Sequence, residues 1–393
     1  MPKITLLARH FSALVLFLSA GILSCSLTQE KKIISKNYCN FININFDNNF
    51  SGARLNSCQK IDPSHFLLTI KPENVPINDS PWYAFKVNSS KNQIIKISLK
   101  FINGTPRYRP KVSKDGKIWK TVPYLLAKDT IHFSLPIKKE TLWIAGQEII
   151  TNTDYQKWTD SISKKKFVEI ENLGSSVNGQ SISAVRVNKE NKDVVVIIGR
   201  QHPPEITGAL ALFSFVETLL SDSHLAVQFR QRFQTLVIPN VNPDGVGLGH
   251  WRHNANGVDT NRDWGLFTQP ETIEVKKHLD SLSQDHTFYL GLDFHSTGKN
   301  YFYTQKDTDP LCPQEFTTNW IQHISEKRPD FLFNRSKRSS NGNPTFKQWF
   351  NTEYAVPSIS YEMGDNTDRE LIKDIAKIAA EEMMRELLAS RCQ

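Results

Sequence analysis

Residues 194–205 read Val-Val-Val-Ile-Ile-Gly-Arg-Gln-His-Pro-Pro-Glu. The continuous β-branched run is typical of a strand buried on both faces of a sheet, and the glycine closes it. The following stretch, 205–220, repeats apolar side chains with the period of a helix. Because α/β domains bind ligands at the carboxyl ends of their strands, His202 and Glu205 fall where such a domain builds its site.

Apolar strands and helical patterns keep alternating from about residue 160 to the end of the chain. Further buried strands are predicted at 235–239, 288–294 and 358–361. A last helix is predicted to start at the capping-box sequence Thr367-Asp368-Arg369-Glu370. This alternation predicts an α/β domain, to which we assign residues 159–393.

Residues 41–158 differ, because short stretches of alternating apolar and polar residues are separated there by turn signals. The alternation is clearest at 41–46, 82–87 and 94–99. Asp115-Gly116 is a strong hairpin signal between two short strand candidates. An antiparallel β-sandwich that precedes the α/β domain explains this pattern most simply.

The first residues are predicted to direct export. An apolar run at 11–23 follows positively charged residues; it is too short to span a bilayer and has the length of a secretory signal. Its end, Gly-Ile-Leu-Ser-Cys at 21–25, resembles a bacterial lipobox. We therefore expect a signal peptide of the lipoprotein type at 1–24, a lipidated Cys25 and a linker at 25–40. The protein would be tethered to a membrane in the bacterial periplasm or outer membrane, and cleavage to a soluble product is the alternative.

Four cysteines remain after Cys25, and an even number in an exported protein is compatible with disulfides. Proximity in sequence suggests Cys39 with Cys58, which leaves Cys312 with Cys392. Three pairings can be drawn, and no motif selects one. No Cys-x-x-Cys occurs, so a thiolate metal site is not expected.

The balance of 48 Lys+Arg against 40 Asp+Glu gives a formal charge of +8. Such a charge could favour an acidic substrate, an anionic membrane or nucleic acid. The densest basic clusters, at 164–166 and 335–338, lack the interleaved aromatic residues of a nucleic-acid-binding surface. We therefore interpret the charge as a solvated surface and expect no nucleic-acid partner.

His202 and Glu205 can supply two zinc ligands if a third arrives from elsewhere in the chain. The pair alone is weak evidence, because a capped helix start with an exposed histidine has the same sequence. His295 follows the predicted strand 288–294, so its imidazole is expected at the same sheet edge, with Asp293 or a backbone carbonyl as its hydrogen-bond partner. Together the three residues predict a zinc site that keeps one position open for water.

Two further groups of polar residues could act on a substrate. The loop 250–264 carries Arg252 and Arg262, and an arginine fork can bind a carboxylate through two hydrogen bonds. Without the zinc ligands this would be an ordinary surface loop. Glu362 lies in an otherwise apolar strand, where burying a carboxylate is costly unless it has a partner or a role. Beside a zinc-bound water it could take the proton of the water and return it to the leaving amine.

The order and rough spacing of these residues resemble the zinc metallocarboxypeptidase family typified by carboxypeptidase A, and more closely its cytosolic carboxypeptidase-like branch. The resemblance implies a mixed central β-sheet flanked by helices, preceded by the β-sandwich. It also implies one zinc ion per chain, held by His202, Glu205 and His295. The upstream stretches that share the resemblance are 81–87, 112–119 and 173–182.

The resemblance also implies which residues handle the substrate. Asn261 and Arg262 match the pair that grips the terminal carboxylate of the substrate. Arg252 matches the arginine that polarises the scissile carbonyl, and Glu362 matches the catalytic glutamate. The implied activity is zinc-dependent hydrolysis of the carboxyl-terminal peptide bond of peptides or proteins, through a zinc-activated water with Glu362 as general base.

One feature of the family is missing from this chain. The family usually places a tyrosine on a mobile loop ahead of the catalytic glutamate, and the stretch 334–350 contains none. Tyr354 and Tyr361 lie nearer to Glu362, and we assign neither a role. Relatives of the cytosolic type often prefer acidic carboxyl-terminal residues, for which the cluster at 335–338 would supply positive charge.

Two other functions fit the same residues. A zinc deacylase of the same fold would act on small N-acyl amino acids, although the large β domain favours peptides. A zinc-stabilised lipoprotein could instead bind ligands that end in a carboxylate, without turnover. Such a binder needs the arginines but could lose Glu362, so the presence of this glutamate favours the hydrolase.

Overall fold

The structure is a computed structural model that describes residues 39–338 and 342–392. The described residues all belong to one compact unit, Asn37–Gln393. The expected signal peptide at 1–24, Cys25 and the expected linker up to residue 38 lie outside the described residues. Export and the lipid anchor therefore stay predictions.

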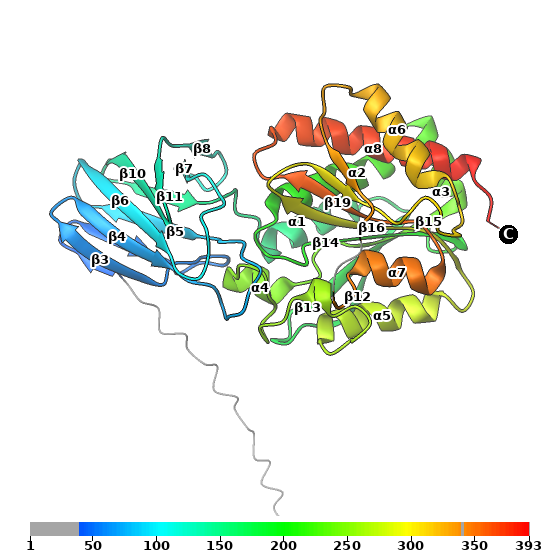
Figure 1. The fold of residues 1–393 in the computed structure, drawn as a ribbon, viewed down its shortest axis with the longest axis horizontal. Coiled ribbons are helices and arrows are strands. Elements are labelled where there is room, and N and C mark those ends of the chain that lie inside the picture. Colours follow the sequence, from blue (N-terminus) through cyan, green and yellow to red (C-terminus); the bar gives the residue numbers. More distant parts are fainter. Residues whose placement is uncertain (1–38, 339–341, 393) are drawn as a thin grey trace, which may run out of the picture. The chain divides into compact units, whose positions relative to one another are not determined.

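The strands between residues 39 and 145 form two sheets that share one apolar core, and we call this segment the β-sandwich (Figure 1). In spatial order, the first sheet contains β1 (Cys39–Phe41), β2 (Ile44–Asp47), β5 (Ala84–Ser89), β11 (Thr141–Ala145), β7 (Lys111–Ser113) and β8 (Lys120–Thr121). The second contains β3 (Ser57–Asp62), β4 (His65–Ile70), β6 (Gln93–Phe101), β10 (Thr130–Ile137) and β9 (Leu125–Ala127). The pairs are antiparallel, as predicted, except that β4 and β6 run parallel.

The stretch 41–46, predicted as one strand, instead contains the end of β1, a tight turn at residues 42–43 and the first residues of β2. Phe41 pairs with Ile44, and Asn43 between them adopts a φ of 65°, a left-handed conformation that asparagine tolerates. Ile42 is consequently 85% exposed. The prediction was wrong here because alternation of apolar and polar residues continues across the turn.

Helix α1 (Asn152–Ile162) follows the β-sandwich and runs through the predicted boundary between residues 158 and 159. Asp154 reaches back to the backbone N–H of Thr151 at 2.9 Å, which caps the start of the helix. The division into two domains stays a prediction.

The rest of the described chain contains a mixed eight-stranded sheet flanked by helices, as the resemblance implied. Its strands, in spatial order, are β12 (Val168–Ser175), β13 (Ser181–Val187), β15 (Phe233–Ile238), β14 (Asp193–Gly199), β16 (Thr287–Thr297), β19 (Ser358–Gly364), β17 (Tyr301–Tyr303) and β18 (Asn334–Ser336). The four central strands, β15, β14, β16 and β19, are parallel to one another. Their side chains are almost all buried, which explains the uninterrupted apolar runs in the sequence.

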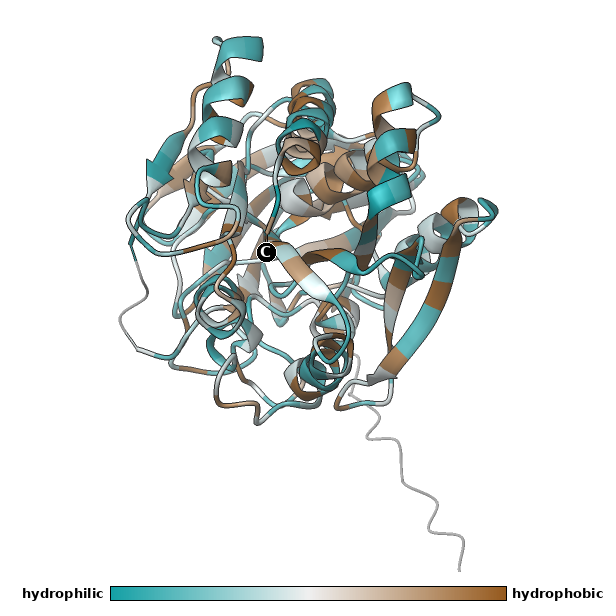
Figure 2. Ribbon diagram, turned by 90° about the vertical axis from the view of Figure 1, so that its right-hand side faces the viewer, coloured by the Kyte–Doolittle hydropathy of each residue, from teal (hydrophilic) through white to brown (hydrophobic). Residues whose placement is uncertain are grey.

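Helices cover both faces of this sheet (Figure 1). On one face lie α1, α2 (Ile206–Leu219), α3 (His224–Arg232), α6 (Phe316–Lys327) and α8 (Arg369–Ala389), and on the other lie α5 (Pro270–Leu282) and α7 (Phe346–Tyr354). A short helix α4 (Pro243–Leu248) and a 3₁₀ turn at Thr260–Arg262 lie in the connecting loops. Figure 2 shows hydrophobic and hydrophilic stretches alternating along the covering helices, as expected where one side of a helix packs on a sheet.

Helix α8 starts at Arg369, and the side chain of Asp368 accepts the N–H groups of Glu370 and Leu371. The cap is thus Asp368, one residue later than the predicted capping box. Within residues 39–338 and 342–392, no single helix is long and apolar enough to cross a membrane. Helices α2 and α3 taken together have the length and apolar composition of a membrane-crossing segment, but they are bent by 88° relative to each other.

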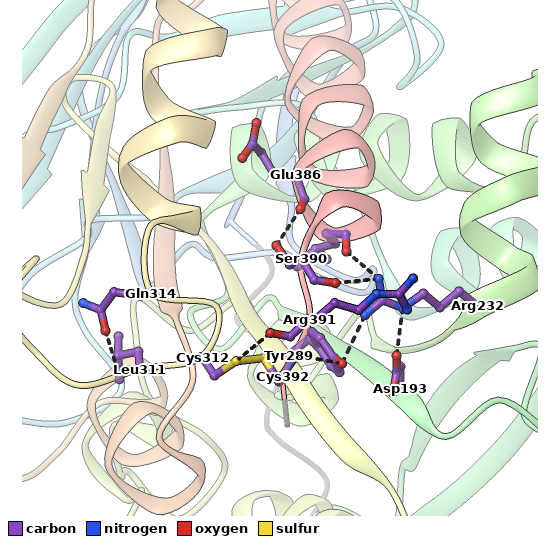
Figure 3. The surroundings of a disulfide bond; sticks show 11 residues. Asp193, Arg232, Tyr289, Leu311, Cys312, Gln314, Glu386, Ser390, Arg391 and Cys392 are labelled. Atoms are coloured by element: carbon purple, nitrogen blue, oxygen red, sulfur yellow. Dashed lines mark hydrogen bonds and ion pairs between the residues drawn. A yellow bond between two sulfur atoms is a disulfide. The ribbon is translucent and has the colours of Figure 1, made fainter.

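Both disulfides suggested by proximity form, Cys39–Cys58 and Cys312–Cys392. The second joins the chain end beyond α8 to a loop before α6 (Figure 3). Arg232 holds the same chain end, since it donates to the carbonyl of Ser390 at 2.7 Å and to Asp193 at 2.9 Å.

Replacing both Cys312 and Cys392 with serine is expected to lower the free energy of unfolding by about 2–4 kcal/mol, because the open chain gains conformational entropy when it unfolds. Denaturant titration measures this loss. The Cys39/Cys58 double serine variant is the comparison, since those cysteines are 19 residues apart instead of 80. A larger loss from opening the shorter loop would contradict the entropic account.

Candidate active site

The carboxyl ends of three neighbouring strands bring the predicted residues together. β14 leads into the loop that carries His202 and Glu205, and β16 carries His295 near its end. β16 and β19 pair in parallel, with His295 directly beside Glu362. Parallel strands end at one edge of a sheet, so residues far apart in the sequence meet there.

His202, Glu205 and His295 offer ligand atoms that all lie within 4.8 Å of one another. All three residues are buried. His202 Nδ1 lies 2.9 Å from one oxygen of Glu205, and His295 Nδ1 lies 2.7 Å from the other. Burial by itself would raise the pKa of Glu205, but the two imidazoles bring it well below its usual range. Two imidazole nitrogens and a carboxylate are a donor set that fits zinc.

The second nitrogen of each imidazole lies against a further carboxylate. His202 Nε2 is 3.1 Å from Asp259, and His295 Nε2 is 2.7 Å from Asp293. The expectation that Asp293 partners His295 is confirmed, whereas Asp259 was not singled out from the sequence. These carboxylates orient both rings so that Nδ1 faces the shared centre, as is common for histidines that bind a metal.

A glycine allows α2 to approach the end of β16. A Cβ on Gly208 would lie 2.4 Å from the backbone oxygen of His295, too close for any side chain. Instead, the N–H of Gly208 donates to the hydroxyl of Ser296 at 2.8 Å. This contact holds the first turn of α2, and Glu205 just before it, against the strand that carries His295.

A pocket of about 590 Å³ opens at this edge of the sheet. Six of the seven predicted site residues line it, and His295 is buried behind them. The six are His202, Glu205, Arg252, Asn261, Arg262 and Glu362. The structure therefore brings together every residue predicted for the site, and their individual roles stay predictions.

Glu362 contributes a carboxylate to the pocket, and one of its two oxygens is buried. Among the described residues, no hydrogen-bond partner exists for its buried Oε2. Burial raises the pKa of Glu362 to about 7, although the neighbouring His295 acts in the opposite direction. An orphaned buried oxygen next to a metal-type donor set fits a carboxylate that faces a metal-associated water.

The comparisons with known proteins agree with this geometry. The family model described as zinc carboxypeptidase matches residues 155–383, more than half of the chain. The chain belongs to the zinc carboxypeptidase family. Zinc is the metal that membership implies, and the donor set formed by His202, Glu205 and His295 fits it.

Cytosolic carboxypeptidase 6 of Mus musculus is similar to this zinc carboxypeptidase family member, with 25% identity over 294 residues. The match covers 66% of this chain and 54% of the mouse protein, so the chain spans about half the length of such curated relatives. A metallo-carboxypeptidase from Burkholderia cenocepacia shares the fold, with a TM-score of 0.75, 16% identity and coverage of 88% of this chain and 99% of that one. One from Pseudomonas aeruginosa, solved with (2-guanidinoethylmercapto)succinic acid, gives a TM-score of 0.70, 18% identity and coverage of 87% and 98%.

The zinc carboxypeptidase site includes both predicted arginines, held in different ways. Arg252 Nε donates to Asp259 at 2.6 Å, so Asp259 joins Arg252 to His202. Arg262 Nη1 donates to the carbonyl of Asn261 at 2.8 Å, and burial lowers the pKa of Arg262. Asn261 lies against His295 Nε2 at 3.0 Å and accepts the N–H of Phe346 at 3.0 Å, so its side chain joins the loop to β16 and to the start of α7.

The β-sandwich holds the loop that carries Arg252. Glu73 accepts the backbone N–H groups of Trp251, Arg252 and His253 at 2.7, 2.9 and 2.7 Å. The indole of Trp251 is fully buried in the β-sandwich core. No local signal in the sequence marks Glu73, because its partners lie almost 180 residues away.

Lys347 and Tyr303 also line the pocket, and the sequence analysis missed both. Lys347 is buried, and its amine donates to the carbonyl of Thr304 at 3.1 Å. Of the predicted basic cluster at 335–338, only Arg338 lines the pocket, because Arg335 and Lys337 both pair with Asp307.

The two tyrosines considered from the sequence lie away from the pocket lining. Tyr361 is buried in the core on one face of the sheet, and Tyr354 packs against aromatic rings on the other. Tyr303 comes from β17 and not from a loop ahead of Glu362. Tyr303 therefore does not match the position at which the family tyrosine is expected, and we assign it no role.

Proposed function

We propose that the chain is a zinc-dependent metallocarboxypeptidase that hydrolyses the carboxyl-terminal peptide bond of peptides or proteins. The observation that carries the proposal is the convergence at one sheet edge. His202, Glu205 and His295 offer a tight donor set, and Glu362 lies beside it with an unpartnered carboxylate oxygen. Arg262 lies in the same pocket as this carboxylate.

His202, Glu205 and His295 would hold the zinc ion. A bound zinc ion lowers the pKa of a water molecule and polarises a carbonyl as a Lewis acid. Asp259 and Asp293 keep the two imidazoles oriented through their Nε2 atoms. The protein thus supplies a rigid, buried donor set.

Glu362 is the proposed general base. Its carboxylate takes a proton from the water that attacks the scissile carbonyl carbon. The carbon–nitrogen bond then breaks, and the same carboxyl returns the proton to the leaving amine. The position of Glu362 beside His295 on the neighbouring strand fits this shuttle, because water and leaving group must both come within hydrogen-bond reach.

Arg262, Asn261 and Arg252 would select the chain end of the substrate. A guanidinium binds a free carboxylate through two charge-assisted hydrogen bonds. An amidated chain end cannot accept this pair, so it should bind poorly. The arginines therefore restrict productive binding to free carboxyl termini.

The direct test is a mass-spectrometric digest of a mixed peptide library by the zinc-loaded protein. Stepwise loss of single carboxyl-terminal residues is the expected result, and the same peptides with amidated ends should stay intact. Internal cleavage would contradict the exopeptidase assignment. Hydrolysis of N-acyl amino acids without trimming of peptides would favour the deacylase alternative.

We further propose that the pocket prefers an acidic carboxyl-terminal side chain. Lys347 is buried in the pocket wall, and among the described residues it forms no ion pair within 4.0 Å. Arg338 lines the same pocket. A buried ammonium without an ion-pair partner is costly, and a carboxylate of the substrate would supply one.

Lys347→Met is expected to lower kcat/KM for peptides ending in glutamate by about 30-fold or more, because truncating one partner of a buried charge pair costs about 2 kcal/mol at least. Peptides ending in leucine should be cleaved as well as before. Parallel assays of the two peptide series measure the change. Lys337→Met is the matched control, since Lys337 pairs with Asp307 and does not line the pocket. An equal loss of kcat/KM for both peptide series would contradict the proposal that Lys347 selects an acidic side chain.

The same lysine gives the preference a pH dependence. Burial lowers the pKa of Lys347 to about 8, with Asp309 acting against the shift. The amine is charged below its pKa and neutral above it, so the ratio of glutamate to leucine cleavage should fall as the pH rises through about 8 and beyond. Lys347→Arg should keep the ratio constant over that range, because arginine stays charged.

A further inference from the structure

Arg107 belongs to the β-sandwich, yet its guanidinium reaches the edge of the eight-stranded sheet. The residue lies between β6 and β7. Its Nε and Nη2 donate to the two carboxylate oxygens of Asp365 at 2.7 and 3.0 Å. Nη2 also donates to the backbone carbonyl of Ser296 at 2.7 Å. One side chain therefore bonds to two strand ends at once.

Those two strand ends carry the residues that matter for the proposed reaction. Ser296 directly follows His295 on β16, and Asp365 lies just after β19, three residues beyond Glu362. The strands are further joined there by the N–H of Asp365, which donates to the carbonyl of Thr297 at 2.8 Å. Arg107 thus links the carboxyl ends of β16 and β19.

The guanidinium is itself held from the β-sandwich side. Nη1 donates to the hydroxyl of Ser80, and the guanidinium carbon lies 5.1 Å from the ring centre of Tyr108. The hydroxyl of Tyr108 bonds to Ser80 at 3.2 Å, and both residues are buried. Asp365 is only 3% exposed and the Arg107 side chain 20% exposed, so water competes weakly for the ion pair. The contact is a rigid bridge and not a surface ion pair.

We propose that Arg107 is a positioning residue, through which the β-sandwich fixes the spacing of His295 and Glu362. The inference rests on the proposed carboxypeptidase function for its kinetic consequence. Without the guanidinium, the buried carboxylate of Asp365 loses its counter-charge, and the ends of β16 and β19 must move to restore solvation. A displacement of about 1 Å in a catalytic group can cost on the order of 100-fold in rate.

The test compares Arg107→Met and Arg107→Lys with wild type and with Arg232→Met. Arg232 is the matched control, because it also clamps a carboxylate and backbone carbonyls, but at the end of α8. All four proteins are assayed for kcat and KM on one cleavable peptide, for zinc affinity by competition with a chelator, and for thermal unfolding.

Arg107→Met is expected to lower kcat by about 10- to 100-fold and to leave KM within about two-fold of wild type. It should also weaken zinc binding by about ten-fold, which is the size of effect seen when the residues that orient metal ligands are removed. Arg107→Lys should recover part of both losses, because an ammonium restores the charge but not the fork. Arg232→Met should lose thermal stability and keep wild-type kcat and zinc affinity.

Wild-type kcat and zinc affinity in Arg107→Met would overturn the proposal, and so would an equal loss of kcat in Arg232→Met. If Arg107→Met does not fold, unchanged kcat and zinc affinity in Arg107→Lys would overturn it instead. If wild type trims no peptide, only the carboxypeptidase function is contradicted. The comparison of zinc affinities would still test whether Arg107 positions the ends of β16 and β19.

Discussion

Replacing Glu362 with glutamine is expected to lower kcat by about 10²- to 10⁴-fold, the usual contribution of a general acid–base group. The amide keeps nearly the same shape, but it cannot accept a proton from water at neutral pH. Glu362 lies beside His295 and is not one of the three predicted ligands, so the variant should bind zinc as wild type does. Steady-state release of carboxyl-terminal residues and metal content by elemental analysis measure the two effects separately.

Glu382→Gln provides the matched control for this substitution. Glu382 is also a buried glutamate, but it lies on α8 and forms an ion pair with Arg385. Its replacement should leave kcat unchanged. If Glu362→Gln trimmed peptides at the wild-type rate, another group would have to handle the proton. If wild type and Glu362→Gln both held zinc and neither cleaved anything, the non-catalytic carboxylate-binding protein would become the better account.

Removing zinc is expected to abolish turnover and to destabilise the fold. Without the metal, the carboxylates of Glu205 and Asp293 stay buried on either side of His295 with no metal cation to offset their charge. A metal that binds the folded state also stabilises it by mass action. Zinc at 1,000 times its dissociation constant should add about 4 kcal/mol to the free energy of unfolding. Thermal unfolding of the chelator-treated protein, before and after zinc is returned, gives the shift, and activity should return with the metal.

His295→Ala should make the thermal stability of the protein independent of zinc. This variant loses one of the three predicted ligands, so its thermal midpoint should no longer respond to zinc and it should cleave no peptide. His286→Ala is the control, because the His286 side chain is also largely buried but lies before β16, away from the donor set. A zinc response in His295→Ala as large as in wild type would mean that the metal binds elsewhere.

The sequence by itself determined the elements that follow local rules and predicted the metal ligands. Continuous β-branched runs identify the buried parallel strands, and polar residues directly after such strands must gather at one sheet edge. That geometry is why His202, Glu205, His295 and Glu362 could be named together before any contact was known. Local rules failed at 41–46, where a turn preserves the alternation of apolar and polar residues.

Only the tertiary structure decided the contacts that hold these residues in place. Asp259 meets His202 across 57 residues, Glu73 meets the N–H of Arg252 across 179, and Arg107 meets Asp365 across 258. Lys347 is an ordinary helical lysine by sequence. It becomes a buried pocket residue only in the folded chain, where its amine reaches the carbonyl of Thr304 just after β17. Such pairings depend on how loops and sheets close around one another, and no periodicity or spacing along the chain encodes that packing.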